Sequence, residues 1–125
     1  MRLVEQVPEG RQIVQRYGNG GFRVSGKQYQ GTILVLANRV VPLSITSPAE
    51  IGEAALAEAL APEMAVELLL VGGGAMACHL PPAARAALDG ARIAHDAMNT
   101  GAACRTYNLL LNEGRHVAAL LFPVD

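Results

Sequence analysis

The chain has 125 residues, carries a formal net charge of −1 at pH 7, and is 51% hydrophobic. Its length is that of one ordinary domain with one hydrophobic core. The near-neutral charge argues against general nucleic-acid binding, and no apolar run approaches the roughly 18 residues that a membrane span needs, so we expect no nucleic-acid partner and no membrane span.

We expect no targeting segment at the start of the chain. The segment MRLVEQVPEG has neither the apolar core of a secretory signal nor the Arg/Ser-rich composition of a transit peptide. The 2 cysteines are expected to be free thiols, because the cytosol keeps thiols reduced. The sequence therefore predicts a cytoplasmic protein with an N-terminal extension, residues 1–11, and a single α/β domain, residues 12–125.

The first third of the chain is punctuated by glycine and is typical of a β-meander. Asn19-Gly20 and Gly26-Lys27 are expected to form turns between short runs of residues that favour strands. The run from Thr32 to Leu36 then predicts a buried strand. These residues indicate antiparallel pairing at the start of the domain.

The segment TSPAEIGEAALAEALAP carries the signals of a helix start. Ser47 is expected to be the N-cap, Pro48 occupies the first helical position, and Glu50 completes a capping box. Pro62 ends the predicted helix. One face is apolar and is expected to lie on the core, and it comprises Ile51, Ala55, Leu56, Ala59 and Leu60.

The rest of the chain alternates between predicted strands and helices. They are the strand Val66 to Val71, the helix Pro81 to Leu88, the strand Ala91 to His95, the helix Thr100 to Asn112 and the strand His116 to Phe122. Short connections between alternating elements indicate parallel pairing. The predicted fold class is α/β, a single compact domain with a mixed β-sheet in which an N-terminal β-meander precedes alternating helices and strands.

A glycine-rich loop follows the first of these strands. Gly72, Gly74 and Ala77 satisfy the G-x-G-x-x-A pattern of dinucleotide sites, in which amides at a helix start hold a pyrophosphate. The context does not fit, because Pro81 and Pro82 would interrupt the required helix. We favour a tight exit from a buried strand and expect no cofactor.

The histidines and cysteines form no metal-binding or catalytic pattern. Cys78 and His79 are adjacent, which is poor chelate geometry, and neither C-x-x-C nor H-x-x-x-H spacing occurs. No Ser/His/Asp order and no paired carboxylates support a hydrolase. We expect neither a bound metal nor catalytic residues.

The segment TGAACRTYNLLLN places a cysteine beside an arginine, which raises the question of a reactive thiol. At 100° per residue, Cys104 and Tyr107 fall on an apolar arc, whereas Arg105 and Asn108 fall on a polar ridge. A reactive thiolate needs exposure and a cationic neighbour. We therefore interpret Cys104 and Tyr107 as structural and expect the thiol to react slowly.

Arg105 has two interpretations. It follows the first turn of a predicted helix whose N-terminal amides carry partial positive charge, so an anion or a partner could bind there. Alternatively, Arg105 pairs with Asp96 or Glu113 and fixes the helix to its neighbours. The candidate partner-binding or anion-binding residues are Gly72, Gly73, Gly74, Thr100, Arg105 and Asn108.

Charges are segregated along the chain. Residues 1–43 carry six basic and two acidic side chains, residues 44–84 carry five acidic and no basic ones, and residues 85–125 carry four of each. Folding could average this segregation away, or it could create a positive and a negative side that favour docking to a protein or an anionic surface.

Five ordered segments together resemble a known family. They are IVQRYGNGGFRV from Ile13, YQGTILV from Tyr29, LLLVGGG from Leu68, MNTGAACRTYN from Met98 and EGRHVAA from Glu113. The set extends over residues 12–122 and is similar to the complex I assembly factor 3 family and its small bacterial relatives of unknown function. The segment from Met98 is the most specific.

The resemblance implies a compact α/β domain with no established enzyme activity or cofactor. Mitochondrial members help to assemble NADH:ubiquinone oxidoreductase by binding other assembly proteins and subunits at the membrane surface. We therefore expect a non-enzymatic protein-binding or assembly module, with peripheral membrane contact and homo-oligomers left open. The alternative is an enzyme or a small-molecule or anion-binding domain that uses the Gly72–Gly74 loop and the N-terminus of the Thr100 helix.

Overall fold

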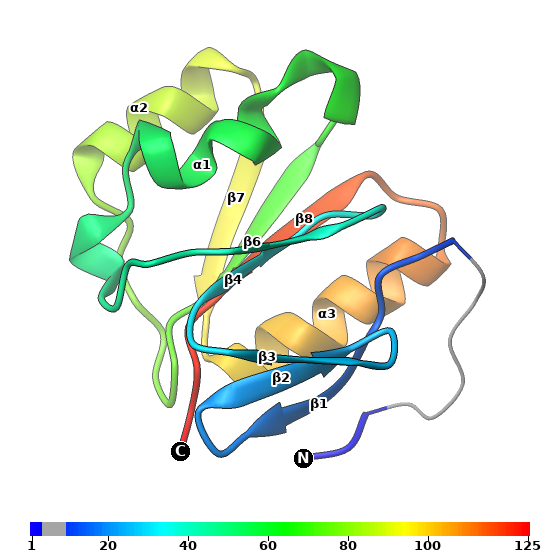
Figure 1. Ribbon diagram of the computed structural model, residues 1–125. Helices are drawn as coiled ribbons and strands as arrows, with labels where there is room; N and C mark the ends of the chain where they lie inside the picture. The colour runs from blue at the N-terminus through cyan, green and yellow to red at the C-terminus, as the bar shows by residue number, and fades with distance from the viewer. Residues whose placement is uncertain (4–9) are drawn as a thin grey trace.

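Two β-sheets and three α-helices form the described part of the chain, residues 1–3 and 10–125, in the computed structural model (Figure 1). The strands are β1 (Val14–Gly18), β2 (Gly21–Val24), β3 (Lys27–Gln30), β4 (Ile33–Val35), β5 (Val40–Pro42), β6 (Leu68–Gly72), β7 (Ala94–Met98) and β8 (Val117–Leu121). The helices are the 3-10 turn η1 (Pro48–Glu50), α1 (Glu53–Leu60), the 3-10 turn η2 (Pro62–Met64), α2 (Pro82–Gly90) and α3 (Thr100–Asn112). Within these residues, no helix has the length and apolar composition needed to cross a membrane.

The larger sheet has five strands in the order β5-β4-β8-β6-β7. β6 pairs in parallel with β7 and β8, whereas β4 pairs antiparallel with β5 and β8. The parallel pairs arise because α2 and α3 return the chain to the same end of the sheet before β7 and β8. The predicted α/β class with a mixed sheet is confirmed.

The meander forms a second, three-stranded antiparallel sheet in the order β1-β2-β3, and so it is not part of the mixed sheet, contrary to the prediction. Its first hairpin turns at Asn19 and Gly20 as predicted, with φ values of 52° and 76°. The second hairpin turns at Ser25 and Gly26, one residue earlier than predicted, with φ values of 47° and 84°. Gly31, at a φ of 80°, then leads the chain out of this sheet, and β4 pairs within the larger one.

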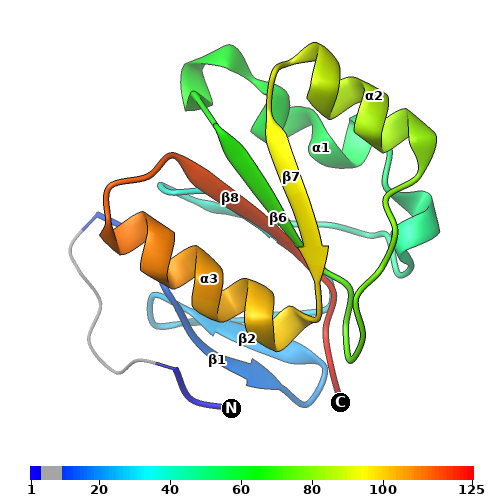
Figure 2. The same cartoon turned by 180° about the vertical axis from the view of Figure 1, so that it is seen from behind.

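Alternating side chains of the larger sheet enter two hydrophobic cores, one on each face. In β8, Ala119 and Leu121 belong to the core that α3 and the three-stranded sheet share, whereas Ala118 and Leu120 belong to the core under α1 and α2. The views in Figure 1 and Figure 2 agree that α3 and β1–β3 lie on the opposite side of the larger sheet from α1 and α2. A central strand of a sheet that is covered on both faces needs apolar side chains at every position, which explains the sequence VAALL.

The predicted capping box exists, but it does not begin the α-helix. Ser47 and Glu50 cap only the single 3-10 turn η1. The backbone then becomes extended at Ile51, with φ −68° and ψ 117°, and the side chain of this residue is 2% exposed in the core. α1 begins only at Glu53. Helix propensity alone predicts an uninterrupted helix. The helix is instead interrupted at Ile51, where the side chain is buried in the core.

β7 also begins later than the predicted start at Ala91. The chain turns through Arg92, which adopts a left-handed φ of 59°, and Ile93 then inserts its side chain into the core below α2. β7 consequently runs over Ala94–Met98 and forms one edge of the larger sheet.

Candidate functional site

The structure brings the predicted Gly72–Gly74 loop and Thr100 together at the C-terminal end of β6. The Thr100 hydroxyl accepts a hydrogen bond from the Gly74 N–H (2.8 Å) and donates one to the carbonyl of Phe122 (2.6 Å). The Thr100 N–H donates to the Gly74 carbonyl at 2.8 Å. Thr100 is fully buried, so these bonds join the ends of β6 and β8 to the start of α3.

Close backbone approach explains the glycines of this loop. A Cβ atom at Gly72 would lie 2.8 Å from the Cα atom of Thr100, and one at Gly73 would lie 2.6 Å from the carbonyl oxygen of Met76. Gly74 has a φ of +99°, which side-chain-bearing residues rarely adopt. These contacts make the loop a tight exit from a buried strand.

The backbone amides at the N-terminus of α3 are mostly used within the protein. The Asn99 side chain accepts from the Ala102 N–H at 2.8 Å, and the Asn99 carbonyl accepts from the Ala103 N–H at 3.0 Å. The hydroxyl of Tyr17 covers Gly101 so closely that a Cβ there would collide with it. An external anion would have to displace these contacts, so the geometry does not favour the anion-binding alternative.

Cys104 and Tyr107 are fully buried between α3 and the sheets. Burial raises the pKa of the Cys104 thiol from 9.0 to about 12, although the nearby Arg105 charge opposes this shift. The Tyr107 hydroxyl lies 2.8 Å from the Gln12 carbonyl and 3.3 Å from the Leu36 carbonyl, and burial raises its pKa as well. Both side chains are protonated at neutral pH and serve packing.

Asn108 and Arg105 have different environments on α3. The Asn108 amide exchanges two hydrogen bonds with the backbone of Val14 in β1. Arg105 is exposed, and among the described residues it forms no ion pair with Asp96 or Glu113. The predicted structural pairing of Arg105 is therefore not formed, and its side chain is open to a partner.

An open hollow of about 420 Å³ lies on the outer face of the three-stranded sheet. Arg16 in β1 is directly opposite Arg23 in β2, which is directly opposite Gln28 in β3. Arg2 pairs with Arg16 from the other side through an isolated antiparallel bridge. All four side chains are exposed and line the hollow. We call this set the arginine row.

The arginine row was not predicted from the sequence, although a signal for it is present. Two-residue turns at Asn19-Gly20 and Ser25-Gly26 fix the register of both hairpins, and this register alone places Arg16, Arg23 and Gln28 side by side.

A second open hollow, of about 360 Å³, lies beside the edge strand β7. Cys78, His79, His95 and Asp96 are among its lining residues. Nonetheless, no three His, Cys, Asp or Glu side chains in the described ranges are placed to hold a metal ion. Burial raises the pKa of the Cys78 thiol, which leaves it protonated and a poor nucleophile.

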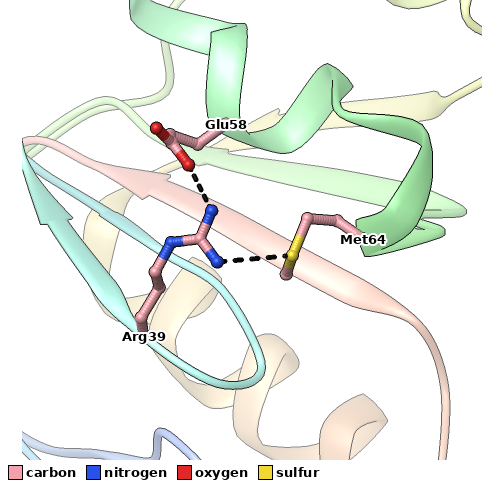
Figure 3. A network of polar contacts seen from close by, with 3 residues as sticks. All are labelled: Arg39, Glu58 and Met64. Atoms are coloured by element: carbon pink, nitrogen blue, oxygen red, sulfur yellow. Dashed lines mark hydrogen bonds and ion pairs between the residues drawn. The ribbon is translucent and has the colours of Figure 1, made fainter.

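An ion pair engages Arg39, a basic side chain that lies away from the arginine row. Arg39, in the turn between β4 and β5, pairs with the Glu58 carboxylate of α1 and donates to the Met64 sulfur at 3.6 Å (Figure 3). Both charged side chains stay nearly half-exposed, so their pairing adds little stability. Its main consequence is that Arg39 does not extend the basic surface.

Several solved structures are similar to this chain over most of its length. An outer membrane protein from Bartonella henselae is 40% identical with a TM-score of 0.85, covering 93% of this chain and 98% of that one. A Mth938-like domain from Bordetella pertussis is 28% identical with a TM-score of 0.81, covering 98% and 92%. These neighbours share the compact α/β fold.

Among curated proteins, an uncharacterized protein of Rhodobacter capsulatus is 36% identical over 111 residues, which are 89% of this chain and 84% of the relative. NADH dehydrogenase [ubiquinone] 1 alpha subcomplex assembly factor 3 of Mus musculus is 30% identical over 88% of this chain, and that of Homo sapiens is 29% identical over 97%. The aligned segment spans 60% and 66% of these two relatives.

The resemblance to assembly factor 3 and its bacterial relatives is confirmed. Residues 14–122 match the family described as protein of unknown function (DUF498/DUF598), and the chain therefore belongs to that family.

Proposed function

We propose that the protein is a non-enzymatic protein-binding module that assists the assembly of respiratory complex I or of another membrane complex. The observation that carries this proposal is the spatial separation of charge between its two ends. A module that brings two other proteins together needs distinct surfaces of distinct chemistry, and separated charge gives each surface its own preferred partner.

The basic end is the three-stranded sheet, and the acidic end is the segment from η1 to η2. Exposed cations of the first end are Arg2, Arg16, Arg23 and Lys27, and exposed carboxylates of the second are Glu50, Glu53, Glu58 and Glu63. Figure 1 and Figure 2 show these elements on opposite sides of the larger sheet. The segregation visible along the sequence is therefore kept in part, because Arg39 lies against the acidic end and pairs with Glu58 there.

Two further observations support a binding role. The residues with the most reactive chemistry in α3 are engaged in packing or in backbone hydrogen bonds, as the burial of Cys104 and the bonds of Asn108 show. Relatives from mouse and human carry the name of an assembly factor for NADH dehydrogenase. The proposal places the module in the cytoplasm, in contact with proteins and not with nucleic acid, and allows peripheral membrane contact and homo-oligomers.

Affinity capture from the native organism tests this function. The full chain, tagged at its C-terminus, is expressed at its normal level, and recovered proteins are identified by mass spectrometry at about 50 mM and about 500 mM salt, because contacts between exposed charges weaken with ionic strength. We expect subunits or assembly proteins of a membrane complex at low salt. Recovery of the same background as an untagged strain at both salt concentrations would overturn the proposal.

A further inference from the structure

The arginine row is an arrangement that a stable sheet does not need. Arg16 and Arg23 are directly opposite one another, and like charges at such positions repel. Among the described residues, no carboxylate forms an ion pair with either of these two guanidinium groups. The repulsion is therefore uncompensated within this part of the chain, and an anion bound between the two side chains would relieve it.

Glycines shape the hollow between these side chains. Gly18 and Gly21 are opposite one another in β1 and β2, beside the Arg16–Arg23 pair, and both line the hollow. A Cβ atom at Gly21 would lie 2.5 Å from the Tyr29 carbonyl and 2.9 Å from the Gln28 amide nitrogen. The absence of a side chain at Gly21 lets the amide groups of Gln28 and Gln30 lie over its backbone, and these glutamines line the hollow together with Arg16 and Arg23.

From this geometry we propose that the arginine row binds an extended acidic segment of a partner protein, with side-chain carboxylates held by Arg16 and Arg23. The proposal rests on the assembly function above and assigns it a site. Guanidinium groups form bidentate bonds with planar carboxylates. Neighbouring strands are about 4.8 Å apart and alternate side chains of an extended peptide about 7 Å apart, so two flexible arginines can each meet one carboxylate.

The remaining lining also fits a peptide better than a large polyanion. Gln28 and Gln30 add amide donors and acceptors at the β3 side, which a peptide backbone can use. Lipid surfaces and nucleic acids present extended negative charge, which favours broad basic surfaces on proteins of positive net charge, whereas the net charge of this chain is −1. A concave site with few cations suits a short segment that enters it.

The direct test uses a short fluorescein-labelled peptide of alternating glutamate and serine, and an identical peptide with glutamine in place of glutamate. Fluorescence anisotropy with the full chain should show binding of the glutamate peptide only, with an affinity that decreases as salt rises from about 50 to about 500 mM. The double variant Arg16→Gln/Arg23→Gln should lose roughly ten-fold or more in affinity.

A matched control separates the site from net charge. Arg85 in α2 and Arg115 before β8 are exposed and lie outside the hollow. The variant Arg85→Gln/Arg115→Gln removes the same charge and should bind the glutamate peptide like the unmodified chain. The charge-reversed variant Arg16→Glu/Arg23→Glu should instead bind a peptide of alternating lysine and serine. The thermal midpoint of each variant verifies that it is folded.

Several results would overturn the proposal. These are equal binding of the glutamate and glutamine peptides, unchanged binding by the Arg16→Gln/Arg23→Gln variant, or tighter binding to anionic lipid vesicles or duplex DNA than to the peptide. Sedimentation that shows self-association lost in the same variant would identify a second copy as the occupant and overturn it too. If this variant loses the peptide yet still captures the native partners, the assembly function stands and only its assignment to the arginine row fails.

Discussion

The side chain of Asn108 pairs with the backbone of Val14 as a neighbouring strand would. Its oxygen accepts from the Val14 N–H at 3.0 Å, and its nitrogen donates to the Val14 carbonyl at 2.8 Å. Val14 is fully buried, so water cannot replace these bonds. Together with the shared hydrophobic core, Asn108 attaches the three-stranded sheet, and with it the arginine row, to α3.

Replacing Asn108→Ala should lower the free energy of unfolding by about 2–4 kcal/mol, because two buried backbone groups each lose a partner. Urea unfolding measures this loss, and hydrogen exchange should show faster exchange of the Val14 amide. Asn112→Ala, at an exposed position of the same helix, is the control and should change stability by less than about 0.5 kcal/mol. Equal effects of the two substitutions would show that the Val14 contact does not matter.

Gly72 offers a test of close packing at the other end of α3. The Cβ atom of Gly72→Ala would lie 2.8 Å from the backbone of Thr100, so the start of the helix must shift, at a cost of about 1–3 kcal/mol. Gly90→Ala at the end of α2 meets open space and should stabilise the helix by about 0.5–1 kcal/mol. Thermal unfolding of both variants checks the opposite signs. A neutral Gly72→Ala would contradict the packing argument.

The sequence predicted those elements whose local signals agree with their burial. The helix from Thr100 to Asn112 has a cap, an amphipathic pattern and a closing glycine, and its bounds are those of α3. The interrupted helix at Ile51 was not predictable, because the demand to bury that side chain comes from α2 and the sheet. Local helix propensity does not depend on such tertiary contacts, so it cannot predict the interruption.

The features of the candidate site also differ in whether the sequence alone can predict them. The hydrogen bonds between Gly74 and Thr100 join segments that are distant in the sequence, and strand order is needed to see them. The register of the arginine row, in contrast, follows from two short hairpins alone. Arg16 and Arg23 are not adjacent in the sequence, so only the hairpin register shows that they are neighbours.

Cys104 should be protected from thiol reagents in the folded protein. Its side chain is fully buried and its pKa is about 12, so almost no accessible thiolate exists at pH 8. Cys78 is only partly buried and is the internal comparison. Iodoacetamide labelling followed by mass spectrometry should modify Cys78 first, and Cys104 only at the rate of unfolding. Fast labelling of Cys104 without denaturant would show an open, reactive thiol.

Alkaline pH should destabilise the protein through the same thiol. The folded pKa of about 12 lies above the ordinary value of 9.0, so the buried thiol stabilises the fold fully below pH 9 and this contribution is lost as pH rises toward 12. Cys104→Ala removes the titrating group. Its free energy of unfolding should therefore fall less between pH 8 and pH 10 than that of the unmodified chain, by about 1 kcal/mol. Parallel curves in urea unfolding would show that Cys104 does not titrate on unfolding.

Substitution of Arg105 is expected to weaken partner binding without changing the stability of the protein. The side chain is exposed and, within the described residues, has no ion pair with Asp96 or Glu113, so Arg105→Gln should change the free energy of unfolding by less than about 0.5 kcal/mol. Capture of the native partners should nevertheless weaken, because an amide cannot reproduce the planar, charged fork of a guanidinium group. The Arg105 guanidinium and the Tyr17 hydroxyl both lie next to Gly101 at the start of α3. Arg85→Gln is the matched exposed control on α2, for which both measurements should stay unchanged. A large loss of stability in Arg105→Gln with partner capture intact would instead make this arginine part of the architecture.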